Sequence, residues 1–139
     1  MTETTIEGIL EVEREKVGYS TTRETKRVTG EVVSLVDKEI HFPSATGWNK
    51  DIYLPGVSIT LKNERGKDKV DFPNFPSELL RTDQLNLIGH KIDYCHEYEV
   101  FDDDCPTGVG STLLYTNKYY LRILSGILKG IKLEREVVN

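Results

Sequence analysis

The sequence predicts a single, mostly β domain, and three observations carry that prediction. The chain has 139 residues, which is enough for one hydrophobic core and too few for two. Its composition, 37% hydrophobic and 29% charged residues, is that of an ordinary globular protein. Apolar and polar residues alternate over several short segments, and clusters of Gly, Pro, Asn and Asp separate these segments.

The first expected strand is long and runs from Val28 to Phe42, where one alternating set of positions is largely apolar. Gly30 lies inside this segment, and a glycine within a strand often marks a bulge or a sharp bend. We therefore expect the strand to curve near Gly30, as a strand of a small barrel does.

A loop and a hairpin are expected next. Residues 43–56 are rich in Pro, Gly and Asn and predict a long connection. Strict alternation over residues 57–62 is the clearest strand pattern in the chain. A turn at residues 63–68 then predicts a hairpin whose second strand returns over residues 69–72.

The second half of the chain predicts one short helix and two further strands. The helix is expected over residues 76–85, with Ser77 as its cap and leucines at helical spacing. A strand with one exposed side is expected over residues 91–101. A loop over residues 102–117 leads to the last strand, which opens at Tyr119.

The N-terminal residues are the hardest to interpret. Residues 8–14 alternate as a strand does, whereas Thr4 and Glu7 fit the start of a helix. We favour the strand. The expected organisation is an N-terminal extension over residues 1–26, packed on a barrel domain formed by residues 27–139.

The phase of each strand predicts one continuous core. The expected members are the apolar residues on the inward positions of the five strands. These are Val32, Val36, Val57, Ile59, Leu61, Val70, Phe72, Ile92, Tyr94, Leu121 and Ile123.

The charge of the chain argues against a dedicated duplex-DNA binder. Such proteins depend on clustered Lys and Arg, whereas this chain has a formal net charge of −5. The acidity is local, however, because five carboxylates without a neighbouring base lie between residues 97 and 104. The remainder of the chain is close to neutral.

The expected location is the cytoplasm. No apolar run approaches the roughly 20 residues that span a bilayer, and residues 1–7 lack the pattern of a secretory signal. The two cysteines, Cys95 and Cys105, are too few for a disulfide framework. We therefore expect neither a membrane partner nor secretion.

The element order resembles that of a known superfamily. The OB-fold has the same order of elements: strand, long loop, strand, tight hairpin, strand, short helix, strand, loop, strand. The resemblance covers residues 27–130 and includes the segment 28–32 at the start of the first strand. It implies a five-stranded Greek-key barrel whose ligand surface lies on the second and third strands, flanked by the loops 43–56 and 102–117.

The residues at this implied surface suit single-stranded nucleic acid, because aromatic rings stack on bases and lysines contact phosphates. An alternative is that the large aromatics of the first loop fold back and cap the barrel. The predicted binding residues are Trp48, Lys50, Tyr53, Lys62, Lys69, Tyr115 and Lys118.

Metal binding and catalysis have weaker sequence support. His90, Cys95, His96 and Cys105 are potential zinc ligands, but their spacing matches no common zinc motif. Cys95 and His96 are also expected on opposite faces of one strand. The sequence shows no nucleophile beside a base and no phosphate-binding glycine loop, so we expect no metal, no cofactor and no enzymatic activity.

Two functions therefore remain from the sequence. The first is a module that binds single-stranded DNA or RNA through the barrel face and its two loops. The alternative is a protein-interaction or assembly subunit that uses the same loops and unpaired strands, and the acidic second loop favours this alternative.

Overall fold

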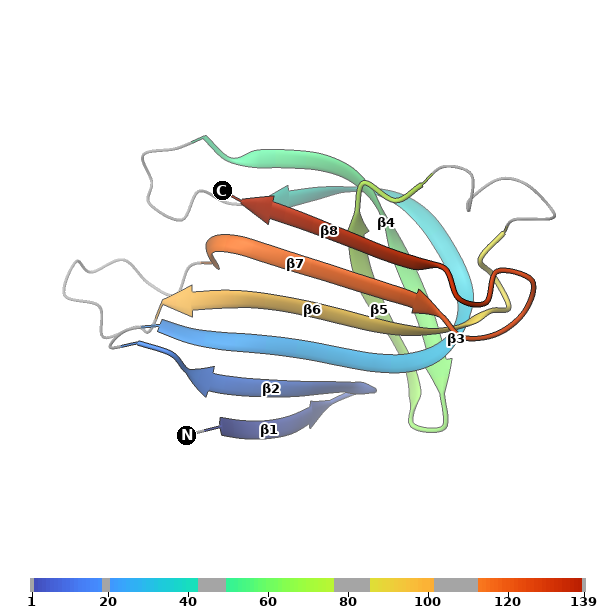
Figure 1. Cartoon of the computed structure of the whole chain (residues 1–139), viewed down its shortest axis with the longest axis horizontal. Helices are drawn as coiled ribbons and strands as arrows, with labels where there is room; N and C mark the ends of the chain where they lie inside the picture. Colours follow the sequence, from blue (N-terminus) through green and yellow to red (C-terminus); the bar gives the residue numbers. More distant parts are fainter. Residues whose placement is uncertain (1, 19–20, 43–49, 77–85, 102–112, 139) are drawn as a thin grey trace.

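The computed structural model describes residues 2–18, 21–42, 50–76, 86–101 and 113–138, and these form one antiparallel sheet of eight strands (Figure 1). The side chains of residues 100, 101 and 113–115 lie outside this description. The strands are β1 (Thr2–Glu7), β2 (Leu10–Lys16), β3 (Thr21–Phe42), β4 (Ile52–Asn63), β5 (Gly66–Pro73), β6 (Lys91–Phe101), β7 (Leu113–Ile123) and β8 (Lys132–Val138). The mostly β class predicted from the sequence is confirmed.

Strand β3 organises the sheet because it is long enough to pair with three others. Its first half pairs with β2 along one edge and with β6 along the other. Its second half bends away and pairs with β4, which pairs in turn with β5. The sheet continues from β6 to β7 and β8, and β1 lies outside β2.

The hairpin of β4 and β5 crosses β6 and β7 at a steep angle (Figure 1). Side chains join the two layers. Phe72 of β5 meets Tyr119 of β7 edge to face, with ring centroids 6.0 Å apart, and the Tyr94 hydroxyl of β6 donates to the carbonyl of Asp71 at 2.8 Å. The hydrophobic core therefore lies between the hairpin and the strands β6 and β7.

The closed five-stranded barrel is not confirmed. Along the described residues, no backbone ladder joins β5 to β7 or β8, so the sheet stays open. The expected helix over residues 76–85 cannot be compared, because residues 77–85 lie outside the described part.

The N-terminal residues form strands, which confirms the favoured interpretation of residues 8–14 over the helix. Two strands are present there, β1 and β2, and β3 begins at Thr21 rather than at Val28. The expected boundary between residues 26 and 27 falls inside β3, which runs through it without interruption. Strand β8 was not predicted from the sequence.

Ten of the eleven predicted core residues are buried, and Val36 is the exception. Its side chain is 58% exposed, so this prediction is wrong. The pairing of β3 with β4 shifts register between Val32 and Ser34, and such a bulge inserts one residue into the alternation. Leu35 consequently takes the inward position opposite Ile59 and packs against the core.

Within the described residues, no helix has both the length and the apolar character needed to cross a lipid bilayer.

Candidate nucleic-acid interface

Three lysines lie on the exposed face of the β4–β5 hairpin. Lys62 is directly opposite Lys67, and Lys69 is directly opposite Thr60. Directly opposed residues of an antiparallel pair project from the same face of the sheet. We call Thr60, Lys62, Lys67 and Lys69 the lysine face. The intervening residues Leu61 and Val70 point into the core, because their side chains are buried.

The hairpin itself does not neutralise the charge of the lysine face, although Glu31 of β3 lies directly opposite Lys62 on its other side. None of its three lysines forms an ion pair with any residue of the described ranges. Lys38 on the neighbouring strand differs, because its Nζ lies 2.9 Å from Asp71 Oδ2. Two lysines directly opposite one another repel, so an anion between Lys62 and Lys67 would relieve an unfavourable contact.

Tyr53 offers an exposed aromatic surface near the start of β4. Its ring stacks on His41, with centroids 4.6 Å apart and planes 8° apart, and its side chain remains 56% exposed. His41 is held in turn by Asp51, whose Oδ2 lies 2.8 Å from His41 Nε2. Tyr53 therefore does not fold back into the core, and one ring face is open to a stacking partner.

The remaining predicted site residues are dispersed. Lys50 is exposed and immediately precedes β4. Lys118 is on β7 between Glu97 and Glu136, its opposite residues on the two neighbouring strands, and carboxylates there would repel a phosphate. Trp48 and the side chain of Tyr115 lie outside the described part of the chain.

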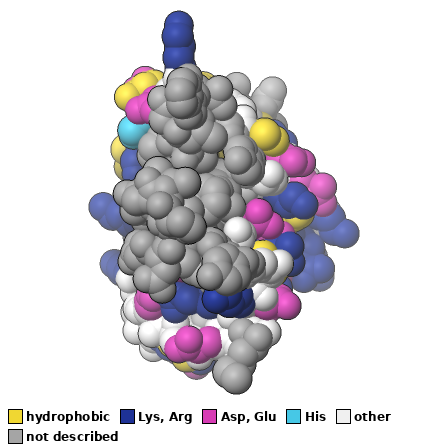
Figure 2. Space-filling model, turned by 90° about the vertical axis from the view of Figure 1, so that its left-hand side faces the viewer, with side chains coloured by type: hydrophobic (Ala, Val, Ile, Leu, Met, Phe, Trp, Pro, Cys, Tyr) yellow, Lys and Arg dark blue, Asp and Glu magenta, His cyan; other side chains and the backbone are white. Residues whose placement is uncertain are grey.

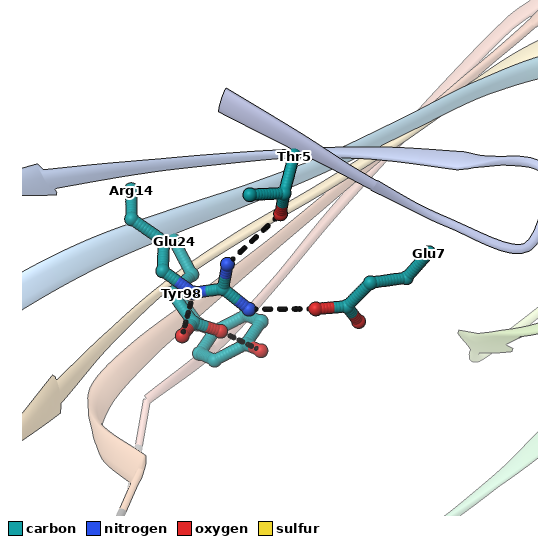
Figure 3. A network of polar contacts seen from close by, with 5 residues as sticks. All are labelled: Thr5, Glu7, Arg14, Glu24 and Tyr98. Carbon is teal, nitrogen blue, oxygen red and sulfur yellow. Dashed lines mark hydrogen bonds and ion pairs between the residues drawn. The ribbon is translucent and has the colours of Figure 1, made fainter. Parts of the chain in front are cut away.

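A polar network lies at the N-terminal end of the sheet and was not predicted from the sequence (Figure 3). Arg14 of β2 donates to Thr5 Oγ1 at 3.0 Å, to Glu7 Oε1 at 2.8 Å and to Glu24 Oε1 at 3.0 Å. The Tyr98 hydroxyl of β6 donates to the other oxygen of Glu24. The Arg14 guanidinium therefore links β1, β2 and β3, and Glu24 extends the network to β6. We assign this network to stability.

A histidine is stacked beside this network. His96 lies on Tyr119 with ring centroids 4.1 Å apart, and its Nε2 donates to Asn117 Oδ1 at 3.0 Å. Burial lowers the pKa of His96 to about 4, although the hydrogen bond to Asn117 opposes this change. The imidazole is therefore neutral at pH 7 and is held as a structural side chain rather than poised as a general base.

Cys95 and His96 point to opposite faces of β6, as the alternation predicted. Cys95 lines a hollow on the outer face, whereas His96 packs on Tyr119 at the inner face. Burial raises the pKa of the Cys95 thiol. Among the described residues, no group of three or more His, Cys, Asp or Glu side chains is arranged to hold a metal ion. Cys105 is not among those residues.

Figure 2 shows the end of the molecule that lies at the left of Figure 1. In the described part of this view, Lys and Arg side chains are mixed with Asp and Glu side chains at the margins. The described side chains visible here therefore carry both signs of charge.

Comparison with known proteins gives no relative: no protein-family model, no curated protein and no solved structure matches this chain.

Proposed function

We propose that this protein binds single-stranded nucleic acid, with the lysine face of β4 and β5 as the primary contact. The observation that carries the proposal is the set of three exposed lysines without ion-pair partners in the described ranges. Lysines in this arrangement attract the phosphate backbone, and counterion release makes such binding favourable at low salt.

Tyr53 forms a separate part of the proposed surface, because it lies seven residues from Thr60 along β4 and in the opposite phase of that strand. A base that stacks on an exposed aromatic ring contributes about 1–3 kcal/mol of binding free energy without demanding a particular sequence. Trp48, Lys50 and Tyr115 extend the proposed surface along the two loops. In this proposal the five strands β3 to β7 act as an OB-like barrel, residues 77–85 supply its helix, and the protein works in the cytoplasm.

The test is fluorescence anisotropy with a labelled 12-residue oligothymidylate and with the matching oligouridylate at low salt. The variant Lys67→Ala/Lys69→Ala removes two charges from the lysine face. Its control, Lys16→Ala/Lys129→Ala, removes the same charge from β2 and from the connection between β7 and β8. The hairpin variant should bind more weakly than the control.

Salt dependence sharpens this test. Each lysine that contacts a phosphate of a single strand contributes about 0.7 to the slope of log affinity against log salt, so the hairpin variant should lose about 1.4. An equal loss of affinity in both variants would indicate a general charge effect and would contradict the proposal.

An assembly subunit is the second candidate, and the open sheet favours it. Within the described residues, β1, β5 and β8 each pair with a single strand, so each presents an unpaired edge. Such edges can accept a strand from a partner chain. This candidate predicts no response to oligonucleotides at low salt.

A further inference from the structure

A shallow hollow of about 680 Å³ lies on the outer face of the sheet, beside the tip of the β4–β5 hairpin. Its lining comes from β2, β3, β6, β7, β8 and the hairpin tip, which lie far apart in the sequence. We call it the outer hollow and define it by Arg27, Asn63, Arg65, Cys95 and Tyr120. It lies outside the two-strand surface that the OB-fold resemblance implies.

Two of the arginines at the outer hollow are available for an anion. Neither Arg27 nor Arg65 forms an ion pair with another described residue, although Arg27 is hydrogen-bonded to the Cys95 side chain. Arg122 also lines the hollow, but its guanidinium lies 2.8 Å from Asp93 Oδ2 and is neutralised there. Guanidinium groups bind phosphate with two parallel hydrogen bonds, which makes Arg27 and Arg65 suitable phosphate ligands.

An aromatic ring completes the chemistry of the outer hollow. Tyr120 lines it and is 36% exposed, so part of its ring is accessible from solvent. Glu11 and Glu134 also line the hollow and would repel an anion. Glu11 lies directly opposite Arg27, and Glu134 directly opposite Tyr120. A ligand would therefore place its phosphate nearest Arg65, on the side of Arg27 away from Glu11, and a planar group against Tyr120.

The outer hollow is continuous with the lysine face. A second, smaller hollow shares Thr29, Asn63 and Arg65 with it, and its other charged lining residues are the basic Lys62 and Lys91 and the acidic Glu31 and Glu64. Asn63 fixes the hairpin tip at this junction, because its Nδ2 donates to the carbonyl of Thr29 at 3.1 Å. Lys62, Arg65 and Arg27 thus lie along the two adjoining hollows, with Glu31, Glu64 and Glu11 among them.

We propose that the outer hollow is a second subsite for the same single strand, reached after it has crossed the hairpin tip. This inference rests on the proposed function. The strand's phosphates contact Arg65 and Arg27, and one base stacks on Tyr120. An open hollow fits a polymer better than a small ligand, since small-molecule sites bury most of the ligand surface.

The test compares a 6-residue with a 12-residue oligothymidylate, because the longer strand can cover the lysine face and the outer hollow together, whereas the shorter one covers less of the two. Tyr120→Ala should weaken binding of the 12-mer by about fivefold or more and that of the 6-mer by less, whereas Tyr120→Phe should restore the 12-mer affinity. Arg27→Gln should likewise weaken the 12-mer more than the 6-mer.

The control is Arg23→Gln, which removes one charge from the same face of β3, four residues from Arg27 and outside the lining of the outer hollow. Unlike Arg27, Arg23 is ion-paired, with Glu99 at 3.6 Å, so its loss also leaves that carboxylate unpaired. Thermal unfolding of each variant verifies that it is folded. Equal effects of Arg27→Gln and Arg23→Gln on the 12-mer, or equal losses for both strand lengths, would overturn the second subsite. Failure of the unchanged protein to bind either strand would instead overturn the proposed function.

Discussion

His96 lies flat on Tyr119, with ring planes 9° apart, and donates a hydrogen bond to the fully buried Asn117. This contact joins β6 to β7 at the inner face of the sheet. Protonation of the imidazole would place a charge among buried aromatic rings, which explains why its pKa is lowered to about 4.

The first prediction concerns pH. The pKa of His96 is about 4 in the folded state and near its ordinary value of 6.5 in the unfolded chain, so the unfolded chain binds the proton first as the pH falls. Stability should therefore be lost between about pH 6.5 and pH 4, with a slope of up to about 1.4 kcal/mol per pH unit. Urea unfolding across this range measures it. His96→Gln should flatten the curve, and an unchanged slope would contradict the assignment.

The second prediction concerns Arg14, whose guanidinium bonds to three side chains. Arg14→Met should lower the free energy of unfolding by about 1–2 kcal/mol, because it removes charge-assisted hydrogen bonds that are only partly exposed. Arg122→Met is the control, since Arg122 is more exposed and, among the described residues, forms its one ion pair with Asp93. It should cost less than about 0.5 kcal/mol. Equal losses would show that the Arg14 network adds little.

The third prediction compares two glycines in the connection between β7 and β8. Both have positive φ, +75° at Gly126 and +96° at Gly130, so alanine is strained at either position. A Cβ at Gly126 would also lie 2.6 Å from the buried ring of His90, whereas Gly130 has open space around it. Gly126→Ala should be more destabilising than Gly130→Ala by about 1–2 kcal/mol.

A double-mutant cycle checks the cause of that difference. In the variant His90→Ala/Gly126→Ala the clash is absent, so the two changes should cost less together than the sum of their separate costs. Simple additivity would show that the His90 ring is not what restricts Gly126.

The fourth prediction tests the bulge in β3. Leu35→Thr should destabilise the fold by about 1–2 kcal/mol, because Leu35 packs against the core. Val36→Thr should change the unfolding free energy by less than about 0.5 kcal/mol, because Val36 is exposed. A larger loss of unfolding free energy for Val36→Thr than for Leu35→Thr in chemical denaturation would contradict the bulge and would place Val36 on the inward side of β3.

The strands in which apolar and polar residues alternate could be predicted from the sequence. The strand segments built of polar residues could not. Val57, Ile59 and Leu61 mark β4 clearly, and all three are buried. The first seven residues of β3 contain no apolar side chain. One of them, Glu24, contacts the polar network around Arg14 instead of an apolar core. Period-two hydrophobicity therefore gives no signal there.

The candidate site was predicted in the same uneven way. Lys62 and Lys69 were identified because the hairpin pattern fixes which residues share a face. Arg27, Arg65 and Tyr120 were missed because the outer hollow joins five strands and a hairpin tip, and sequence adjacency does not reveal such a meeting. Strand β8 was also missed, although Leu133 and Val137 recur on one phase within it.

The most direct test of the central claim is to locate the bound strand by NMR. Backbone amide shifts of the labelled protein would be recorded during titration with 6-residue oligothymidylate at low salt. Binding at the lysine face predicts that the largest shifts fall between Thr60 and Lys69, with further shifts near Tyr53. No shifts, or shifts concentrated in β1 and β2, would contradict binding at the lysine face.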